Sequence, residues 1–146
     1  MTSSLPLELT AWQKMLIRDS FASLGEYAES VAVLCYGRLF EVAPQVRRLF
    51  KIEIHEQARK LMGMLTTVID ALDHFGELRH ELEELGRRHT GYGIQAADYE
   101  LLCTALIWAF AQALGAEFDR ETRAAWQNLL AAVSKIMLEG AGIRAS

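Results

Sequence analysis

LGRRHTGYG, residues 85–93, places a histidine on an apolar helix face and then ends the helix at once. Three leucines share that face with the histidine in the stripe Leu78, Leu82, Leu85, His89, which has the spacing i, i+4, i+7, i+11. A buried imidazole nitrogen without a partner costs free energy. His89 therefore needs a carbonyl, a carboxylate or a metal ion as its partner.

The composition predicts one domain with a substantial core. The chain has 146 residues, of which 51% are hydrophobic, and this excludes disorder. We expect a single domain over residues 1–146, with its core at about 8–139 and a frayed tail at 140–146. The apolar run LLCTALIWAFAQAL is short for a membrane span and contains threonine and glutamine, so we expect a buried helix there.

Charge and targeting signals favour a cytoplasmic protein without nucleic-acid or membrane partners. The net charge is −4, and no basic stripe offsets the acidic balance. The N-terminus, MTSSLPLELTAWQKM, lacks the charged segment and apolar core of a signal peptide. Cys35 and Cys103 lie in apolar helical runs without a CxxC motif, so we expect reduced thiols, although a disulfide between them stays open. We expect a monomer or a weak homo-oligomer.

Hydrophobic periodicity predicts an all-α chain, because no alternating strand pattern of useful length occurs. The second predicted helix is apolar on most faces and should be deeply buried. The predicted helices cover about 7–24, 26–42, 44–50, 57–72, 77–89, 96–115 and 119–139, with a connection at 51–56 and a break at 73–76. Their expected buried stripes are Leu61, Met64, Leu65, Val68 and Leu72; Tyr99, Leu102, Leu106, Phe110 and Ala113; and Trp126, Leu129, Leu130, Val133 and Met137.

The order of these unequal helices, and the side chains at their junctions, resemble the globin family. The resemblance is closest to the single-domain bacterial haemoglobins and the haem domain of flavohaemoglobins, and it covers about residues 8–139. It rests on matches in register at globin spacing: Pro44 with Phe50, Tyr36, Gln57 with Leu61, His89, and Tyr99 ten residues later.

The resemblance implies a globin fold of about seven helices around a haem b pocket. His89 becomes the proximal iron ligand, with its other ring nitrogen bonded to a carbonyl near Leu85. Tyr36 and Gln57 become distal hydrogen-bond donors to a diatomic ligand. The remaining expected cofactor contacts are Phe50 flat on the haem, Leu61 over the iron, Leu85 and Tyr99 on the proximal side, and Lys60 and Arg88 at the propionates.

Each of these residues also has an ordinary alternative. His89 could be a hydrogen-bonded core histidine, Tyr36 an ordinary buried tyrosine, and Gln57 a solvent-facing side chain near a helix start. His55 precedes Gln57 by two residues, which turn a helix by about 200°, so it should point away from the iron. A slipped register would make His55 a sixth ligand instead. We expect His74 and His80 to be exposed and outside the pocket.

Two departures from flavohaemoglobins affect the expected chemistry. Their proximal glutamate position falls at Ala141 here, and Glu139 lies two residues short of it. Unless the helix end is distorted to bring Glu139 inward, the carboxylate that favours O–O bond activation is missing, which puts dioxygenase or weak peroxidase activity in doubt. After Ser146 there is no reductase domain, so we expect turnover to require a separate reductase.

The leading functional hypothesis is a haem protein that binds dioxygen reversibly, for storage or delivery, with nitric oxide and carbon monoxide as further ligands. The second is a nitric oxide dioxygenase that detoxifies nitric oxide with a separate reductase. A haem-based gas sensor is a third hypothesis, although no output domain is attached. A helical interaction protein without a cofactor is a fourth, and it requires every match above to be coincidence.

Overall fold

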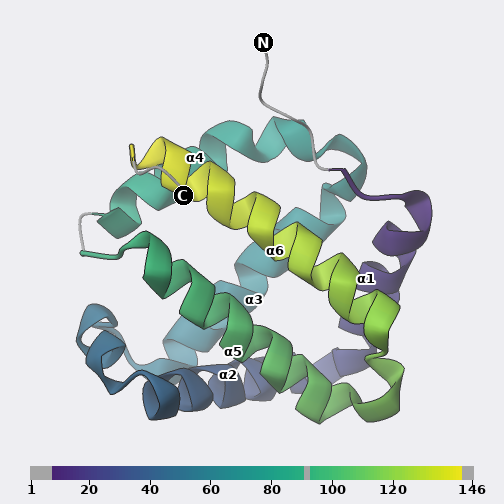
Figure 1. Cartoon of the computed structure of the whole chain (residues 1–146), viewed down its shortest axis with the longest axis horizontal. Helices are drawn as coiled ribbons and strands as arrows, with labels where there is room; N and C mark the ends of the chain where they lie inside the picture. Colours follow the sequence, from purple (N-terminus) through teal and green to yellow (C-terminus); the bar gives the residue numbers. More distant parts are fainter. Residues whose placement is uncertain (1–7, 91–92, 143–146) are drawn as a thin grey trace.

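The computed structural model describes residues 8–90 and 93–142, and within these ranges it contains six α-helices and no strand. Figure 1 shows α4 lying across one end of α6, with α1 beside its other end. The elements are α1 (Ala11–Leu24), η1 (Gly25–Tyr27), α2 (Ala28–Val42), η2 (Pro44–Leu49), α3 (Ile54–Asp70), η3 (Leu72–Leu78), α4 (Arg79–Thr90), α5 (Ala96–Leu114), η4 (Gly115–Glu117) and α6 (Arg120–Gly140), where η marks a 3₁₀ helix. The predicted all-α fold is confirmed.

Helix boundaries differ from the prediction where capping side chains override hydrophobic periodicity. The first helix begins at Ala11 instead of residue 7, because Thr10 and Gln13 form a capping box. Glu53 caps α3 and starts it inside the predicted connection 51–56. The short segment after Pro44 is a 3₁₀ helix that ends at Leu49, and the expected break at 73–76 lies within η3.

The core lies where α5 and α6 meet α1 and α2. Trp126 of α6 is fully buried and packs against Phe110 of α5, with ring centroids 4.7 Å apart. Its indole N–H donates to the Ser20 hydroxyl at 2.8 Å, which satisfies the one polar atom of the ring and joins α6 to α1. The expected buried stripe of α6 is confirmed at all of its positions.

The predicted burial of α2 and α5 is only partly correct. Leu34 and Val42 of α2 are exposed, because α3 and α5 cover the other faces of this helix. On α5, Ala113 is exposed and Leu102 is half-buried. Ala96–Glu117 is long and apolar enough to cross a membrane by length and composition, yet α5 packs here against α2 and α6.

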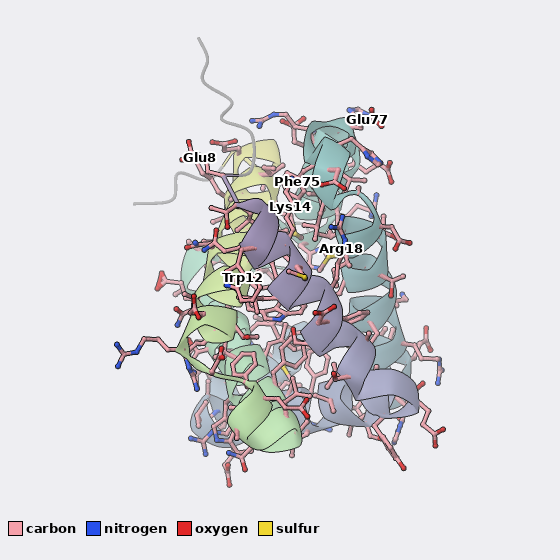
Figure 2. The ribbon with its side chains drawn as sticks, turned by 90° about the vertical axis from the view of Figure 1, so that its right-hand side faces the viewer. Glu8, Trp12, Lys14, Arg18, Phe75 and Glu77 are labelled. Carbon is pink, nitrogen blue, oxygen red and sulfur yellow. The ribbon has the colours of Figure 1, made fainter. Side chains whose placement is uncertain are left out.

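Surface ion pairs join α1 to η3 on the opposite side of the molecule from α2. Lys14 and Arg18 both pair with the Asp73 carboxylate, at 3.1 and 3.2 Å. Figure 2 shows Lys14 and Arg18 on the side of α1 next to Phe75, a buried residue of η3. The hydrogen bond from Lys14, with the Arg18 charge, holds the pKa of Asp73 below its ordinary value. These pairs keep η3, which leads into α4, against the first helix.

Candidate functional site

A cavity of about 340 Å³ lies between α3 and α4. Its apolar walls come from both helices and from the end of η3, and its rim carries charged side chains of α4. Five of the ten lining residues were predicted on apolar helix stripes, and Leu85 and Arg88 were predicted as site residues. The lining consists of Met64, Thr67, Val68, Leu78, His80, Glu81, Leu82, Glu84, Leu85 and Arg88.

His89 lies in the last turn of α4 and is half-buried. Its Nδ1 is 2.7 Å from the carbonyl oxygen of Leu85, one turn earlier, which confirms the predicted carbonyl partner. Because a carbonyl can only accept, Nδ1 carries the proton and Nε2 carries the lone pair of the neutral ring. The tautomer and the ring orientation are those that a metal-ligating imidazole needs. Residues 91–92, the centre of the predicted turn after His89, lie outside the described residues.

The electrostatic environment keeps His89 neutral at pH 7. Burial lowers the pKa of His89 most strongly, the bond to Leu85 raises it, and the charges of Arg88 and Lys60 lower it again. Lys60 projects from α3 and Arg88 from α4, so cations from the two facing helices both act on the same imidazole. Both cations are exposed, and Arg88 lines the α3–α4 cavity, so a bound group that carries carboxylates would find a cation there.

Tyr36 of α2 and Gln57 of α3 come together as predicted, although 21 residues separate them. The Gln57 amide donates to the Tyr36 hydroxyl over 3.4 Å. Tyr36 is only 1% exposed, and burial raises its pKa well above the ordinary value, so the phenol keeps its proton. Within the described part of the chain, that proton has no acceptor. A buried donor of this kind fits a site that receives a ligand.

Phe50 lies beside Tyr36 in an aromatic cluster. The two rings are 5.4 Å apart in an edge-on arrangement, and Phe40 of α2 lies 5.5 Å from Phe50. Phe50 is half-buried, while Leu61 of α3 is buried one turn beyond Gln57. Tyr36, Phe40 and Phe50 therefore form one aromatic cluster beside Gln57, and none of these four residues lines the α3–α4 cavity.

Tyr99 of α5, the residue expected on the proximal side, is buried, and burial raises its pKa to about 12. Its hydroxyl has no hydrogen-bond partner among the described residues. The flavohaemoglobin-like set of histidine, tyrosine and glutamate is not assembled here. Its expected third member, Glu139, pairs instead with Arg79 at 2.7 Å and is 41% exposed on its side chain.

The position of Glu139 corrects the alternative in which the end of α6 bends inward. The helix continues regularly through Gly140, so Glu139 turns outward to the first turn of α4, far along that helix from His89. Arg79 also pairs with Glu83 of its own helix at 3.0 Å, so the carboxylate of Glu139 belongs to a surface ion cluster. No described carboxylate contacts the His89 ring to push electron density toward a metal.

The other histidines lie outside the site, with one partial exception. His55 points outward as expected: its side chain is 58% exposed, and Nδ1 is 3.7 Å from the Glu29 carboxylate. This geometry removes the slipped register that would bring His55 inward. His74 is exposed. His80 is also exposed, but it lines the rim of the α3–α4 cavity and so was wrongly placed outside the pocket.

The sequence analysis placed three of the cavity residues on buried helix stripes without naming them as site residues. Met64, Val68 and Leu82 line the cavity, and their position could be found from their spacing, because each lies three, four or seven residues from a predicted site residue on the same helix face. The close approach of α4 to α6 had no visible signal beyond the glycines at 86 and 140. Both cysteines are free thiols, as expected, although Cys103 is only half-buried.

Comparison with known proteins gives the family of the chain. The chain is 27% identical to neuroglobins from Tetraodon nigroviridis and Danio rerio, and 28% identical to one from Chaenocephalus aceratus. Each match covers 91% of this chain and 92% of the relative. These relatives give no support to the expected likeness to bacterial haemoglobins and flavohaemoglobins. The globin family model matches residues 33–137, which hold the α3–α4 cleft, His89 and the Tyr36–Gln57 pair, and the chain therefore belongs to the globin family.

Proposed function

We propose that this globin binds haem b through His89 and takes up dioxygen reversibly, with Tyr36 and Gln57 as hydrogen-bond donors to the bound gas. The family implies a haem cofactor and the binding of diatomic gases such as dioxygen. The single observation that carries the finer proposal is the presence of a neutral, oriented imidazole on α4 together with a buried phenol on α2 whose proton has no acceptor among the described residues. Storage or delivery of oxygen is the role that reversible binding supports.

The residues present fit a haem. His89 offers Nε2 as an axial ligand, with the Leu85 carbonyl fixing the ring. Apolar side chains of α3 and α4, such as Met64 and Leu85, line the cleft and remain half-buried, as side chains against a flat apolar cofactor would. Lys60 and Arg88 supply cations for its two carboxylates. When bound, the haem supplies a ferrous iron that binds dioxygen reversibly.

The chain's own contribution to gas binding is hydrogen bonding on the Tyr36 side. Tyr36 keeps its proton at neutral pH and can donate it to a ligand that gains negative charge on binding. Gln57 holds the phenol oxygen through its amide, so the phenol is oriented with its proton directed elsewhere. This Tyr–Gln pair is the feature for which we propose a likeness to bacterial haemoglobins. Nitric oxide and carbon monoxide would occupy the same place.

Nitric oxide dioxygenation and peroxidase activity are not part of this proposal. Both gain from a carboxylate that strengthens electron donation by the proximal histidine, and the nearest candidate, Glu139, is bound to Arg79 at the surface. We propose a cytoplasmic protein with free thiols at Cys35 and Cys103, and a separate reductase that returns ferric haem to the ferrous state. A sensor role would need a partner that responds to the gas.

The test is the visible absorption spectrum of the haem-loaded protein when ferric, when reduced and after exposure to oxygen. The same spectra are taken of His89→Ala and, as a control, of His74→Ala, which changes an exposed histidine that does not line the cavity. We expect a stable oxygenated spectrum in the wild type and in His74→Ala, and its loss in His89→Ala. A wild-type protein that holds no haem, or a His89→Ala variant that behaves as the wild type, would overturn the proposal.

A further inference from the structure

Two glycines allow α4 and α6 to touch through their backbones. A Cβ atom on Gly86 of α4 would lie 1.9 Å from the Met137 carbonyl oxygen and 2.5 Å from its carbonyl carbon. A Cβ atom on Gly140 of α6 would lie 2.4 Å from the Cα of Glu83. Real Cβ atoms essentially never come within 3.0 Å of such atoms. Residues 83 and 86 of α4 face residues 140 and 137 of α6 where the two helices cross, and neither glycine position has room for a side chain (Figure 1).

The contact lies next to the proposed iron ligand. Three residues turn a helix by about 300°, so Gly86 and His89 point only about 60° apart and are separated by less than one turn along α4. Leu85, whose carbonyl holds the His89 ring, directly precedes Gly86. The side of α4 that rests on α6 is therefore adjacent to the side that carries His89, and the backbone of α6 limits how far α4 can move in that direction.

We propose that Gly86 is a positioning residue for His89: its contact with the Met137 backbone sets where the imidazole stands and how tightly it binds iron. This inference rests on the proposed function, because it concerns the strength of the His89–iron bond. A contact with the far end of a side chain relaxes when a rotamer changes, whereas a contact with helix backbone relaxes only if the helices separate. α6 is itself fixed at its other end by the buried Trp126–Ser20 bond, so α4 is the helix that must shift.

The proposal predicts a specific effect of one methyl group. In Gly86→Ala the new Cβ must move from 1.9 Å to at least 3.0 Å from the Met137 oxygen, so α4 moves away by about 1 Å. A displacement of that size at a ligating side chain is large enough to change its bond to the ligand. Gly63→Ala is the matched control, because Gly63 is an exposed helical glycine on α3 whose added Cβ would meet nothing within 4 Å.

The experiment measures the iron–histidine stretching band of the reduced, gas-free protein by resonance Raman spectroscopy, together with the rate of haem transfer to an excess of apomyoglobin. We expect Gly86→Ala to shift or broaden the band and to release haem about tenfold faster or more, because overpacking at this contact strains the position of His89. Gly63→Ala should match the wild type in both. A purely structural role of Gly86 would lower stability and leave the band unchanged, and this result would overturn the inference.

Gly140→Ala keeps the proposal testable if Gly86→Ala does not fold. Its added methyl group presses on Glu83, farther from His89, at the last residue of α6, where the final turn can yield. We expect a smaller shift of the same band, and an unchanged band in this folded variant would count against the inference. A wild type that lacks the iron–histidine band would refute the proposed function itself, whereas a wild-type band that neither glycine variant alters would refute only the positioning role.

Discussion

The two helices that line the cleft hold their site residues in different ways. On α4, backbone atoms fix His89: the Leu85 carbonyl binds its ring at 2.7 Å, and Gly86 rests directly on the backbone of α6. On α3, a side chain reaches a side chain, because the half-buried Gln57 bonds to Tyr36 over a longer 3.4 Å. Backbone contacts change little with sequence or thermal motion, while side-chain contacts adjust easily. The contacts on α4 thus suit a residue that stays in one position, and those on α3 suit side chains that adjust when a gas binds.

The largest effect is expected from removal of His89, the residue that backbone contacts hold in place on α4. His89→Gly should abolish the histidine-ligated ferrous spectrum, and free imidazole added to the solution should restore it. The added ring can occupy the space of the deleted side chain and can donate to the Leu85 carbonyl, whose position does not depend on residue 89. Titrating imidazole against the absorption spectrum measures this recovery.

A control variant separates this recovery from unspecific binding of imidazole. In His74→Gly, the spectrum before any addition should equal that of the wild type, because His74 is exposed and does not line the cavity. If His89→Gly retained a histidine-ligated spectrum without imidazole, another side chain would be the ligand, and the comparison between the two helices would lose its basis.

On the side of the Tyr36–Gln57 pair, which we call the adjustable side, Tyr36→Phe is expected to have the next largest effect. The change removes the donor to the bound gas and leaves the Gln57 amide without its partner. A hydrogen bond to a group that gains charge contributes about 1.5–3 kcal/mol, so dioxygen should dissociate about tenfold faster or more. Stopped-flow measurement of dioxygen release checks this. Carbon monoxide gains less negative charge, so its release should change less, and an equal change for both gases would point to altered access instead of a lost donor.

Gln57→Leu should have a smaller effect than Tyr36→Phe. Gln57 is half-buried and its bond to the phenol is long, which indicates a contribution of about 0.5–1 kcal/mol, or a few-fold faster release of dioxygen. The matched control is His55→Leu, two residues away on the outward face, which should leave the release rate unchanged. Equal effects of the two substitutions would mean that the amide has no special place beside the ligand.

The sequence predicts local features well, because helix periodicity relates residues that are close along the chain. The stripe that ends at His89, and the Leu85 carbonyl one turn before it, follow from 3.6 residues per turn. The capping side chains that moved the helix starts, such as Thr10 and Glu53, were present in the sequence but were outweighed by apolar periodicity in the prediction. Such boundaries are decided by single hydrogen bonds, which periodicity does not register.

Relations across the fold were harder to predict. The meeting of Tyr36 and Gln57 followed only from the family resemblance, since no rule of spacing joins two helices. The bond between Arg79 and Glu139 links residues 60 apart, and it decided that Glu139 lies outside the site. The glycine contact of α4 with α6 depends on the crossing of two helices, which a single sequence does not specify.

The smallest expected effect concerns the outer surface of the adjustable side. The Glu29 carboxylate of α2 lies 3.7 Å from His55 and 3.6 Å from Arg59 on α3, and all three side chains are substantially exposed. Exposed ion pairs contribute little, so Glu29→Gln should lower the free energy of unfolding by less than about 1 kcal/mol, and the loss should disappear in 1 M salt. Denaturant unfolding at low and high salt measures this difference.

The same variant tests whether these pairs influence the site behind them. Because Gln57 is held by Tyr36 and not by the surface pairs, Glu29→Gln should leave the release of dioxygen unchanged. A release rate altered as much as in Gln57→Leu would mean that the ion pairs hold the start of α3 in place. Surface side chains would then also help to position Gln57. The difference from α4 would be that its contacts to the site residue are local backbone contacts, whereas those of α3 extend to the protein surface.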